Sequence, residues 1–268
     1  MKILEIKNLQ FSYPNKQVFK NLNLTIEEKT ITTIVGNNKS GKTTLIKLIC
    51  GLLDSNDSII AGYTYIDSKR IYDNSKLFGV VFSNTNNKFL FTDVYKEMAF
   101  PLENLNYSKY DIEKRIITIA KEFGNTKILD KKTDDLTNSE KQELLIMIAL
   151  LHEPKILLLD NSFSMMDKNR TQKIIKILKN YTEKKNLTII LTTTNLEHII
   201  NSDYTYVLNK GNIVMEGKPN SILKEDTILN RAGLELPFMI DLSLKLEFYE
   251  LINEEYTDMD RLVNTLWK

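Results

Sequence analysis

One short segment near the N-terminus has the residue types and spacing of a phosphate-binding loop, G-x-x-x-x-G-K-[ST]. In this pattern the glycines let backbone N–H groups turn towards phosphate oxygens, and the helix that follows adds a favourable dipole. The lysine neutralises phosphate charge, and the last hydroxyl binds Mg²⁺. We therefore predict that the segment binds a nucleoside triphosphate with Mg²⁺. It consists of Gly36, Asn37, Asn38, Lys39, Ser40, Gly41, Lys42 and Thr43, with Thr43 as the predicted Mg²⁺ ligand, and Thr44, which follows it, is a further predicted binding residue.

The elements that must position this loop are predicted on both sides of it. The β-branched run Thr30–Val35 predicts a strand before it, and the apolar periodicity from Lys42 to about Leu53 predicts a helix after it. Asp160 follows the apolar run Lys155–Leu159, so its carboxylate should lie at the end of a parallel strand, where Mg²⁺ is held beside such loops. A chance match, or an aspartate that only forms a turn, is the alternative for each segment. Agreement between the two segments favours the site.

Other strands follow from short apolar patterns. Alternation in Ile3–Leu9 and Phe19–Ile26 predicts an antiparallel pair joined by a turn at Tyr13–Lys16. Continuous apolar runs predict buried strands of a parallel sheet covered on both faces. These runs are Phe78–Phe82, Ile156–Leu159 and Leu187–Leu191. The chain is therefore expected to have an α/β fold.

Helices are expected between and after these strands. Asp93–Phe123 and Ser139–Leu151 have helical patterns, with Gly124 ending the first and Ser139 capping the second. Strands at Tyr204–Asn209 and Asn212–Glu216 should form a hairpin that closes the α/β part. Residues from about 229 to 268 should form short amphipathic helices, with breaks near Pro237 and at Glu254–Glu255.

Composition excludes several classes of protein. The chain has 268 residues, of which 42% are hydrophobic, and its 36 basic residues balance 35 acidic ones, so no charge excess indicates a nucleic-acid partner. The longest apolar run, Leu144–Leu151, is too short to span a bilayer, and no signal-peptide pattern is present. We expect a cytosolic chain that reaches a membrane only through a partner. Its single cysteine, Cys50, is expected to be a buried structural thiol.

Further segments resemble ABC ATPases, which have a P-loop NTPase fold. Phe11–Pro14 matches the aromatic loop that stacks on adenine, so the resemblance makes Tyr13 the base platform. Leu136–Gln142 stands where the family has Leu-Ser-Gly-Gly-Gln-Lys-Gln, and Ser164–Asp167 resembles the D-loop. The resemblance implies ATP and Mg²⁺ as ligands, and a signature that faces the nucleotide of a partner cassette. The signature residues are Thr137, Asn138, Ser139 and Glu140.

Three less specific segments resemble the ATPase subunits of energy-coupling factor importers: Ala99–Asn104, Arg231–Phe238 and 262–268. The resemblance implies a cassette over residues 1–228, with a parallel-sheet core, an antiparallel β layer and a helical subdomain at about 90–152. Residues 229–268 would be a helical extension and a candidate dimerisation element. The implied partners are a second ABC ATPase subunit, in a heterodimer rather than a homodimer, a transmembrane coupling protein and a substrate-binding membrane subunit. Such an assembly would work at the cytoplasmic face of the membrane and import a vitamin or metal ion.

The chain departs from the family at its hydrolytic positions. Asn161 stands in place of the glutamate that polarises the attacking water, and an amide is no useful general base. Thr194 replaces the switch histidine, and Ser83 replaces the glutamine that follows the strand at Phe78–Phe82. His198 is expected to be an ordinary surface histidine rather than a substitute. These departures predict weak hydrolysis.

The loops that contact phosphate also depart from the pattern. Asn138 and Ser139 replace glycines that allow close backbone approach, and Glu140 adds a negative charge that should repel phosphate. Lys39 replaces a usual glycine, which either strains the loop, if φ must be positive there, or adds compensating charge.

Four functions remain open at this point. The first is a transporter subunit that binds ATP while a partner does most of the hydrolysis. The second, an active homodimeric transporter ATPase, is disfavoured by Asn161 and Thr194. The third is a soluble ABC ATPase acting on ribosomes or DNA, for which the sequence has no second cassette, coiled-coil insert or basic extension. The fourth is a regulatory nucleotide-binding ABC protein without a transport role.

Overall fold

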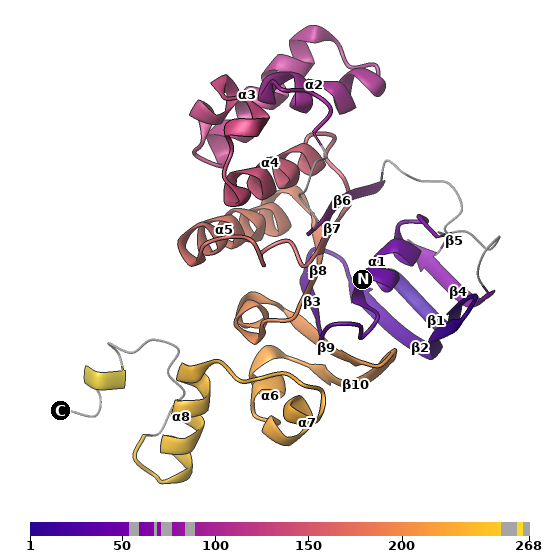
Figure 1. Cartoon of the computed structure of the whole chain (residues 1–268), viewed down its shortest axis with the longest axis vertical. Coiled ribbons are helices and arrows are strands. Elements are labelled where there is room, and N and C mark those ends of the chain that lie inside the picture. Colours follow the sequence, from indigo (N-terminus) through magenta and orange to yellow (C-terminus); the bar gives the residue numbers. More distant parts are fainter. Residues whose placement is uncertain (54–58, 67–68, 71–76, 84–88, 253–261, 265–268) are drawn as a thin grey trace.

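The computed structural model describes residues 1–53, 59–66, 69–70, 77–83, 89–252 and 262–264. A central parallel sheet separates an antiparallel sheet from a group of helices (Figure 1). The described strands are β1 (Lys2–Tyr13), β2 (Lys16–Glu27), β3 (Ile31–Val35), β4 (Ile59–Ile66), β5 (Lys69–Arg70), β6 (Phe78–Phe82), β7 (Ile156–Asp160), β8 (Thr188–Thr193), β9 (Tyr204–Asn209) and β10 (Asn212–Gly217). The described α-helices are α1 (Lys42–Ile49), α2 (Val94–Asn104), α3 (Lys109–Glu122), α4 (Asn138–Leu150), α5 (Lys168–Lys185), α6 (Pro219–Leu223), α7 (Asp226–Arg231) and α8 (Phe238–Phe248).

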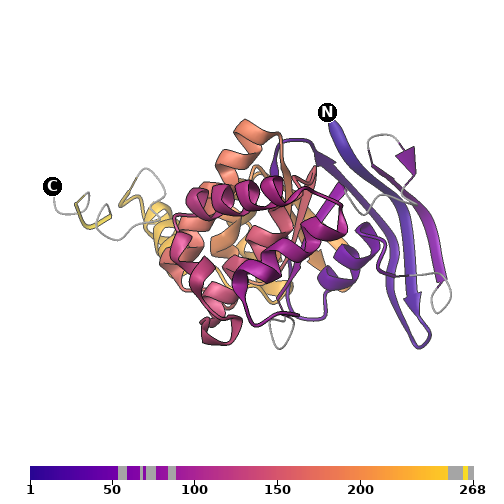
Figure 2. The same ribbon diagram turned by 90° about the horizontal axis from the view of Figure 1, so that it is seen from above.

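The central sheet has the order β10-β9-β3-β8-β7-β6, and only β10 runs antiparallel to its neighbour. Its register aligns Val35 with Thr193, and Asp160 with both Thr192 and Phe82. Because parallel strands end at a common edge, the residues that follow β3, β6, β7 and β8 meet there. The antiparallel sheet has the order β2-β1-β4-β5 and lies beside the core (Figure 2). The predicted α/β fold is confirmed.

The burial of strand β7 on both faces explains why its sequence is apolar without alternation. Ile156 and Leu158 pack in a core shared with α1 and the antiparallel strands. Leu157 and Leu159 pack in a second core, on the other face, with α2, α3 and α4. A strand covered on both faces needs apolar residues at every position. This double burial fixes Asp160 at the edge of the sheet.

Some predicted helix limits were wrong. Helix α1 ends at Ile49 rather than near Leu53, because the chain turns and the Leu52 N–H bonds back to the Lys47 carbonyl at 2.8 Å. The predicted helix from Asp93 to Phe123 is divided into α2 and α3, since Ser108 caps a new helix by accepting a hydrogen bond from Asp111 N. Gly124 follows the end of α3 as predicted.

The cap of α4 is also different from the prediction. Thr137, not Ser139, is the N-cap: its hydroxyl accepts a hydrogen bond from Glu140 N, and the Glu140 carboxylate accepts one from Thr137 N. This reciprocal pair is a capping box, which the spacing Thr-x-x-Glu favours over a serine two residues later. The Ser139 side chain is therefore available for another contact.

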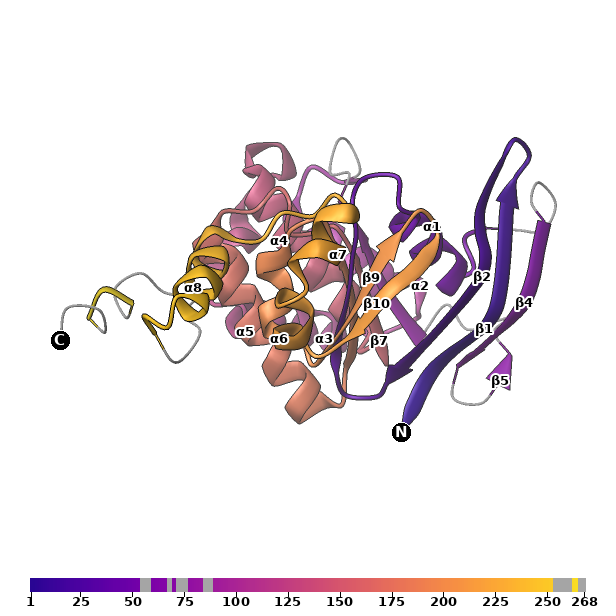
Figure 3. The same cartoon turned by 90° about the horizontal axis from the view of Figure 1, so that it is seen from below.

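Helices α6 and α7 pack beside β9 and β10, on the side of the core away from the antiparallel sheet, and α8 lies further from these strands (Figure 3). Leu229, Ala232 and Leu234 share a small core with Val35 and Val207. The boundary between residues 228 and 229 stays a prediction, and α7 runs across it. The predicted break at 254–255 lies outside the described residues. Among the residues that the structure describes, no helix combines the length and apolar character needed to cross a membrane.

Candidate nucleotide-binding site

A polar cleft of about 350 Å³ opens at the edge where the strands end. It gathers most of the site residues predicted from the sequence, although they come from distant parts of the chain. Its lining is Tyr13, Lys16, Val18, Asn38, Lys39, Gly41, Lys42, Thr43, Thr44, Ser83, Asp160, Asn161 and Thr194. The predicted signature residues are not part of this lining.

The glycines of the loop are required by both packing and backbone geometry. A Cβ on Gly36 would lie 2.2 Å from the Leu208 carbonyl oxygen, so this backbone can pass only without a side chain. Gly41 has a φ of +112° and faces the Phe19 ring, where a Cβ would lie 2.9 Å from a ring carbon. These constraints hold the loop against β9 and β2, directly before α1.

Lys42 is folded back into the loop. Its Nζ donates hydrogen bonds to the carbonyls of Gly36 at 2.6 Å and Asn37 at 2.9 Å, and the side chain is buried. Burial lowers the pKa of Lys42 to about 8, and Asp160 opposes that shift. An ammonium that is partly desolvated and held by neutral carbonyls is well placed to transfer its contacts to a phosphate.

This geometry predicts proton uptake when a nucleotide binds. Free Lys42 is partly neutral near pH 8, and bound phosphates should raise its pKa, so binding at pH 8 should take up roughly half a proton. The affinity for Mg-ATP should then fall as the pH rises above 8. Calorimetry in buffers of different ionisation enthalpy measures the uptake. A measurement at pH 6.5, where the ammonium is already charged, is the control, and equal uptake at the two pH values would exclude Lys42 as the source.

Thr43 and Asp160 provide oxygen atoms of the kind that Mg²⁺ prefers. The Thr43 hydroxyl donates to Asp160 Oδ2 at 2.8 Å, and the Asp160 side chain is buried at the floor of the cleft. Thr192 donates to the other carboxylate oxygen, Oδ1, at 2.6 Å. The residues present therefore fit a magnesium ion, which the Thr43 hydroxyl oxygen and the Asp160 carboxylate would hold. Thr192 was not predicted, because only the register of β7 and β8 brings it beside Asp160.

The positions that lack catalytic side chains also lie at this cleft. Asn161, Thr194 and Ser83 all line it, and none carries an imidazole or a carboxylate. The Asn161 N–H donates to both the carbonyl and the hydroxyl of Thr192, at 3.0 and 3.1 Å. Asn161 has a φ of +50°, a left-handed conformation that asparagine adopts more readily than glutamate. The backbone here therefore suits the residue that is present.

The environments of His198 and Cys50 can be compared with those predicted from the sequence. His198 is not a surface histidine: it is half-buried, shares a 2.8 Å hydrogen bond with Thr193 Oγ1 and packs edge-on against Phe163. Burial lowers the pKa of His198, and its ring is absent from the cleft lining. Cys50 is half-buried, donates to the Lys47 carbonyl at 3.6 Å and has a thiol pKa raised by burial.

Lys39 has a φ of +65°, a left-handed conformation that glycine adopts without strain and lysine does not. Of the two predicted effects of Lys39, strain in the loop is therefore the one that this backbone supports. Its side chain is exposed at the mouth of the cleft. A left-handed conformation costs a non-glycine residue about 1 kcal/mol. Glycine would remove this strain, but it would also raise the conformational entropy of the unfolded chain, which offsets part of the gain in stability.

We therefore expect Lys39→Gly to raise the free energy of unfolding by about 0.5 kcal/mol, measured from urea midpoints. Lys179→Gly is the control, because Lys179 is exposed within α5, where glycine lowers stability by about 1 kcal/mol. If both variants lose stability equally, the conformation at Lys39 is not strained.

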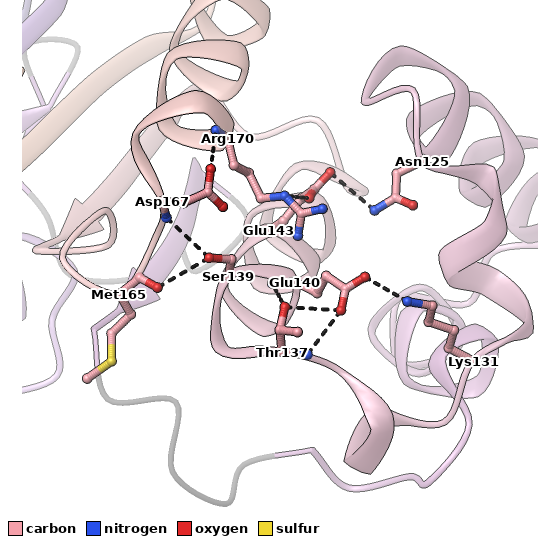
Figure 4. A network of polar contacts seen from close by, with 9 residues as sticks. All are labelled: Asn125, Lys131, Thr137, Ser139, Glu140, Glu143, Met165, Asp167 and Arg170. Atoms are coloured by element: carbon pink, nitrogen blue, oxygen red, sulfur yellow. Dashed lines mark hydrogen bonds and ion pairs between the residues drawn. The ribbon is translucent and has the colours of Figure 1, made fainter.

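The signature residues lie away from the cleft, at the start of α4 (Figure 4). The Glu140 carboxylate is part of the capping box and forms a 2.7 Å ion pair with Lys131. The contacts with Lys131 and Thr137 lower the pKa of Glu140 to about 2, against the opposing effect of burial. The predicted repulsion of phosphate is therefore reduced, since the charge of Glu140 is already compensated within the chain.

One more contact was missed from the sequence. The Asn37 side chain lies against Gly233, where an added Cβ would be 2.5 Å from Asn37 Nδ2. The same side chain accepts a hydrogen bond from Asn38 N at 2.6 Å. The C-terminal segment thus contacts the phosphate-binding loop directly, which no local pattern indicates.

Comparisons with known proteins identify the family of this chain. The model of the ABC transporter family matches residues 19–164. The chain is 34% identical to the energy-coupling factor transporter ATP-binding protein EcfA1 of Oenococcus oeni, over 100% of the chain and 98% of that protein. Its identity to EcfA1 of Ligilactobacillus salivarius is 36%, over 88% and 85% of the two chains. The structure of CbiO1 from Clostridium perfringens, part of the ABC transporter complex CbiONQ, matches with a TM-score of 0.76 and 26% identity, over 88% of this chain and 96% of that one. The chain therefore belongs to the ABC transporter family and, within it, to the energy-coupling factor transporter ATP-binding proteins.

Proposed function

We propose that this chain is the ATP-binding subunit of an importer that binds Mg-ATP, closes against a second cassette and passes that closure to a membrane protein. The observation that carries the proposal is the cleft, whose lining brings together the predicted binding residues Tyr13, Lys42, Thr43 and Asp160, and has no imidazole or carboxylate at Ser83, Asn161 and Thr194. Its cargo would be a micronutrient, a vitamin or a metal ion, selected by a separate membrane subunit. The chain would lie at the cytoplasmic face of the membrane as a peripheral subunit.

Within the cleft, the residues have distinct roles. Tyr13, whose ring packs edge-on against Phe11 and whose hydroxyl lies 3.4 Å from Thr44 Oγ1, would stack on the adenine base. Lys42 would move from the loop carbonyls to the phosphates. Thr43 and Asp160 would hold Mg²⁺, which neutralises charge on the phosphates when it is bound. Asn161 would contact the attacking water without removing its proton.

A second cassette is needed because the cleft of one chain does not include a signature segment, which the partner would have to supply. The signature residues Thr137–Glu140 do not line the cleft of their own chain. They are exposed or half-buried at the start of a helix, whose N-terminus favours anions. We infer that they close over the nucleotide of the partner. A heterodimer is favoured over a homodimer, because two copies of this chain would have no general base at either site.

The membrane partner would dock beside Phe82 and Ser83, on the segment that leads into α2. Leu90 is 71% exposed there, and Phe91 and Phe100 are half-buried with ring centroids 5.5 Å apart. The segment is held in shape by Glu97, whose Oε2 accepts hydrogen bonds from the backbone of Leu90 and Phe91, each at 2.8 Å. Exposed apolar groups on such a rigid support suit a protein partner.

The test is purification of the tagged chain from the membranes of its own organism. Wild type should retain a multi-span membrane protein and a second cassette with an intact catalytic glutamate, identified by mass spectrometry. Leu90→Lys should lose most of the membrane protein, because a charge would enter an apolar contact. Tyr110→Lys is the matched control, since Tyr110 is 72% exposed at the start of α3, outside the docking segment.

Two outcomes would contradict the proposal. If Leu90→Lys retains the membrane protein while Tyr110→Lys loses it, the docking surface is wrong. If no membrane protein accompanies the wild type, the chain is a regulatory or soluble ATPase instead.

A further inference from the structure

The signature segment is tied to the D-loop by a side chain that glycine could not provide. Ser139 Oγ accepts a hydrogen bond from Asp167 N at 3.2 Å and donates one to the Met165 carbonyl at 3.4 Å (Figure 4). The hydroxyl thus bridges the start of α4 and the loop before α5. Because Thr137 already caps α4, Ser139 is not needed to start the helix.

A second tie lies one turn further along the same helices. Glu143, which is 2% exposed, has its Oε2 3.2 Å from Arg170 Nε, an ion pair without hydrogen-bond geometry, and Asn125 Nδ2 donates to Oε1 at 3.5 Å (Figure 4). Asp167 caps α5 by accepting a hydrogen bond from Arg170 N at 2.8 Å. A buried carboxylate beside one guanidinium is costly to separate, so this pair resists relative movement of α4 and α5.

The D-loop connects in turn to the chain's own cleft. Ser164 donates twice to the Asn161 carbonyl, from its N–H at 3.2 Å and from its hydroxyl at 2.9 Å. Asn161 N bonds to Thr192, whose hydroxyl holds Asp160. Hydrogen bonds joined by short stretches of backbone therefore link the signature, through Ser139 and the D-loop, to the carboxylate at the floor of the cleft.

We propose that Ser139 is a positioning residue that couples the two nucleotide sites of the assembly. This inference depends on the proposed function, in which the signature closes over the partner's nucleotide. When the signature moves against that nucleotide, Ser139 carries the D-loop with it, and the D-loop shifts Asn161 and Thr192 at this chain's own site. By reciprocity, occupancy of this site biases the signature towards the partner. A glycine at position 139 would remove the direct link between the signature and the D-loop and leave only the pairing of Glu143 with Arg170.

The first experiment tests the tie itself, by hydrogen–deuterium exchange on the full isolated chain. Ser139→Ala should speed exchange in the peptide containing residues 164–170 about threefold or more, because Asp167 N loses its acceptor. Ser139→Thr keeps the hydroxyl and should exchange like the wild type. Ser108→Ala is the control: it removes a serine contact at the cap of α3, away from the D-loop. Unchanged exchange in Ser139→Ala would overturn the proposal.

The second experiment tests coupling, in the assembly purified with its second cassette. ATP turnover is compared for wild type, Lys42→Ala, Ser139→Ala and the double variant. If Ser139 transmits the state of this site, Lys42→Ala should lower turnover severalfold in the wild-type background and have almost no further effect after Ser139→Ala. A purely structural role would make the two losses multiply, and that result would overturn the proposal. Ser139→Thr should restore the dependence on Lys42. If no second cassette is obtained, the proposed function fails, while the exchange experiment still decides whether the tie exists.

Discussion

Mg-ATP should stabilise the wild-type chain against thermal unfolding and leave Lys42→Ala unchanged. At a ligand concentration one hundred times Kd, binding to the native state contributes ~2.7 kcal/mol, which corresponds to ~5 °C or more for a chain of this size. The effect depends on Lys42 because its ammonium, held between the carbonyls of Gly36 and Asn37, is the one cation buried at the loop in the described structure.

Lys47→Ala is the matched control, since Lys47 belongs to the last turn of the same helix and does not line the cleft. Differential scanning fluorimetry of the three proteins, with and without Mg-ATP, measures the shifts. Lys47→Ala should be stabilised like the wild type. If Lys42→Ala is stabilised equally, or if neither protein responds, the nucleotide does not bind at this cleft.

The fold could be predicted where local pattern and final environment agree. Strand β7 is buried on both faces, and an uninterrupted apolar run is typical of such a strand. The residues of the phosphate-binding loop are consecutive in sequence, so their proximity could be predicted without knowing how distant segments pack. Asp160 was placed correctly because parallel strands end at one edge.

Predictions failed where the environment is set by distant segments. Thr192 reaches Asp160 only through strand register, and Asn37 meets Gly233 only through the packing of the C-terminal segment. His198 was assigned to the surface because nothing nearby in sequence indicates that Phe163 covers it. The cap of α4 is a different kind of error, since the Thr-x-x-Glu pattern was present and a nearby serine was preferred to it.

The isolated chain should hydrolyse ATP very slowly. Loss of a positioned general base removes about two to four decades of rate, so Asn161 should bring turnover well below the usual ~1 to 1000 per second. Thr194, which stands at the position of the family's switch histidine, should remove a further contact to the terminal phosphate. Asn161→Asp should change little, because its carboxylate is too short to reach the water.

In the assembly, turnover should depend on the partner. In the proposed heterodimer, the partner's catalytic glutamate would act at the partner's own nucleotide, over which this chain's signature would close, so removing that glutamate should cost far more than any change at Asn161. Replacing both Asn161→Glu and Thr194→His should help only where the partner's signature is intact. Glutamate at position 161 must also adopt a φ of +50°, at a cost of about 1 kcal/mol, so the recovery should be incomplete.

The deciding measurement is steady-state phosphate release by the purified single chain. Lys42→Ala, prepared in the same way, exposes contaminating ATPases, since their activity would survive the substitution. Release at or above ~1 per second, within the range of ordinary enzymes and abolished by Lys42→Ala, would show that Asn161 and Thr194 are tolerated. Another group would then have to activate the water. His198 would be the first group to test, because it lines an adjoining hollow together with Asn161 and Thr194, and its Nδ1 bond to Thr193 leaves Nε2 available.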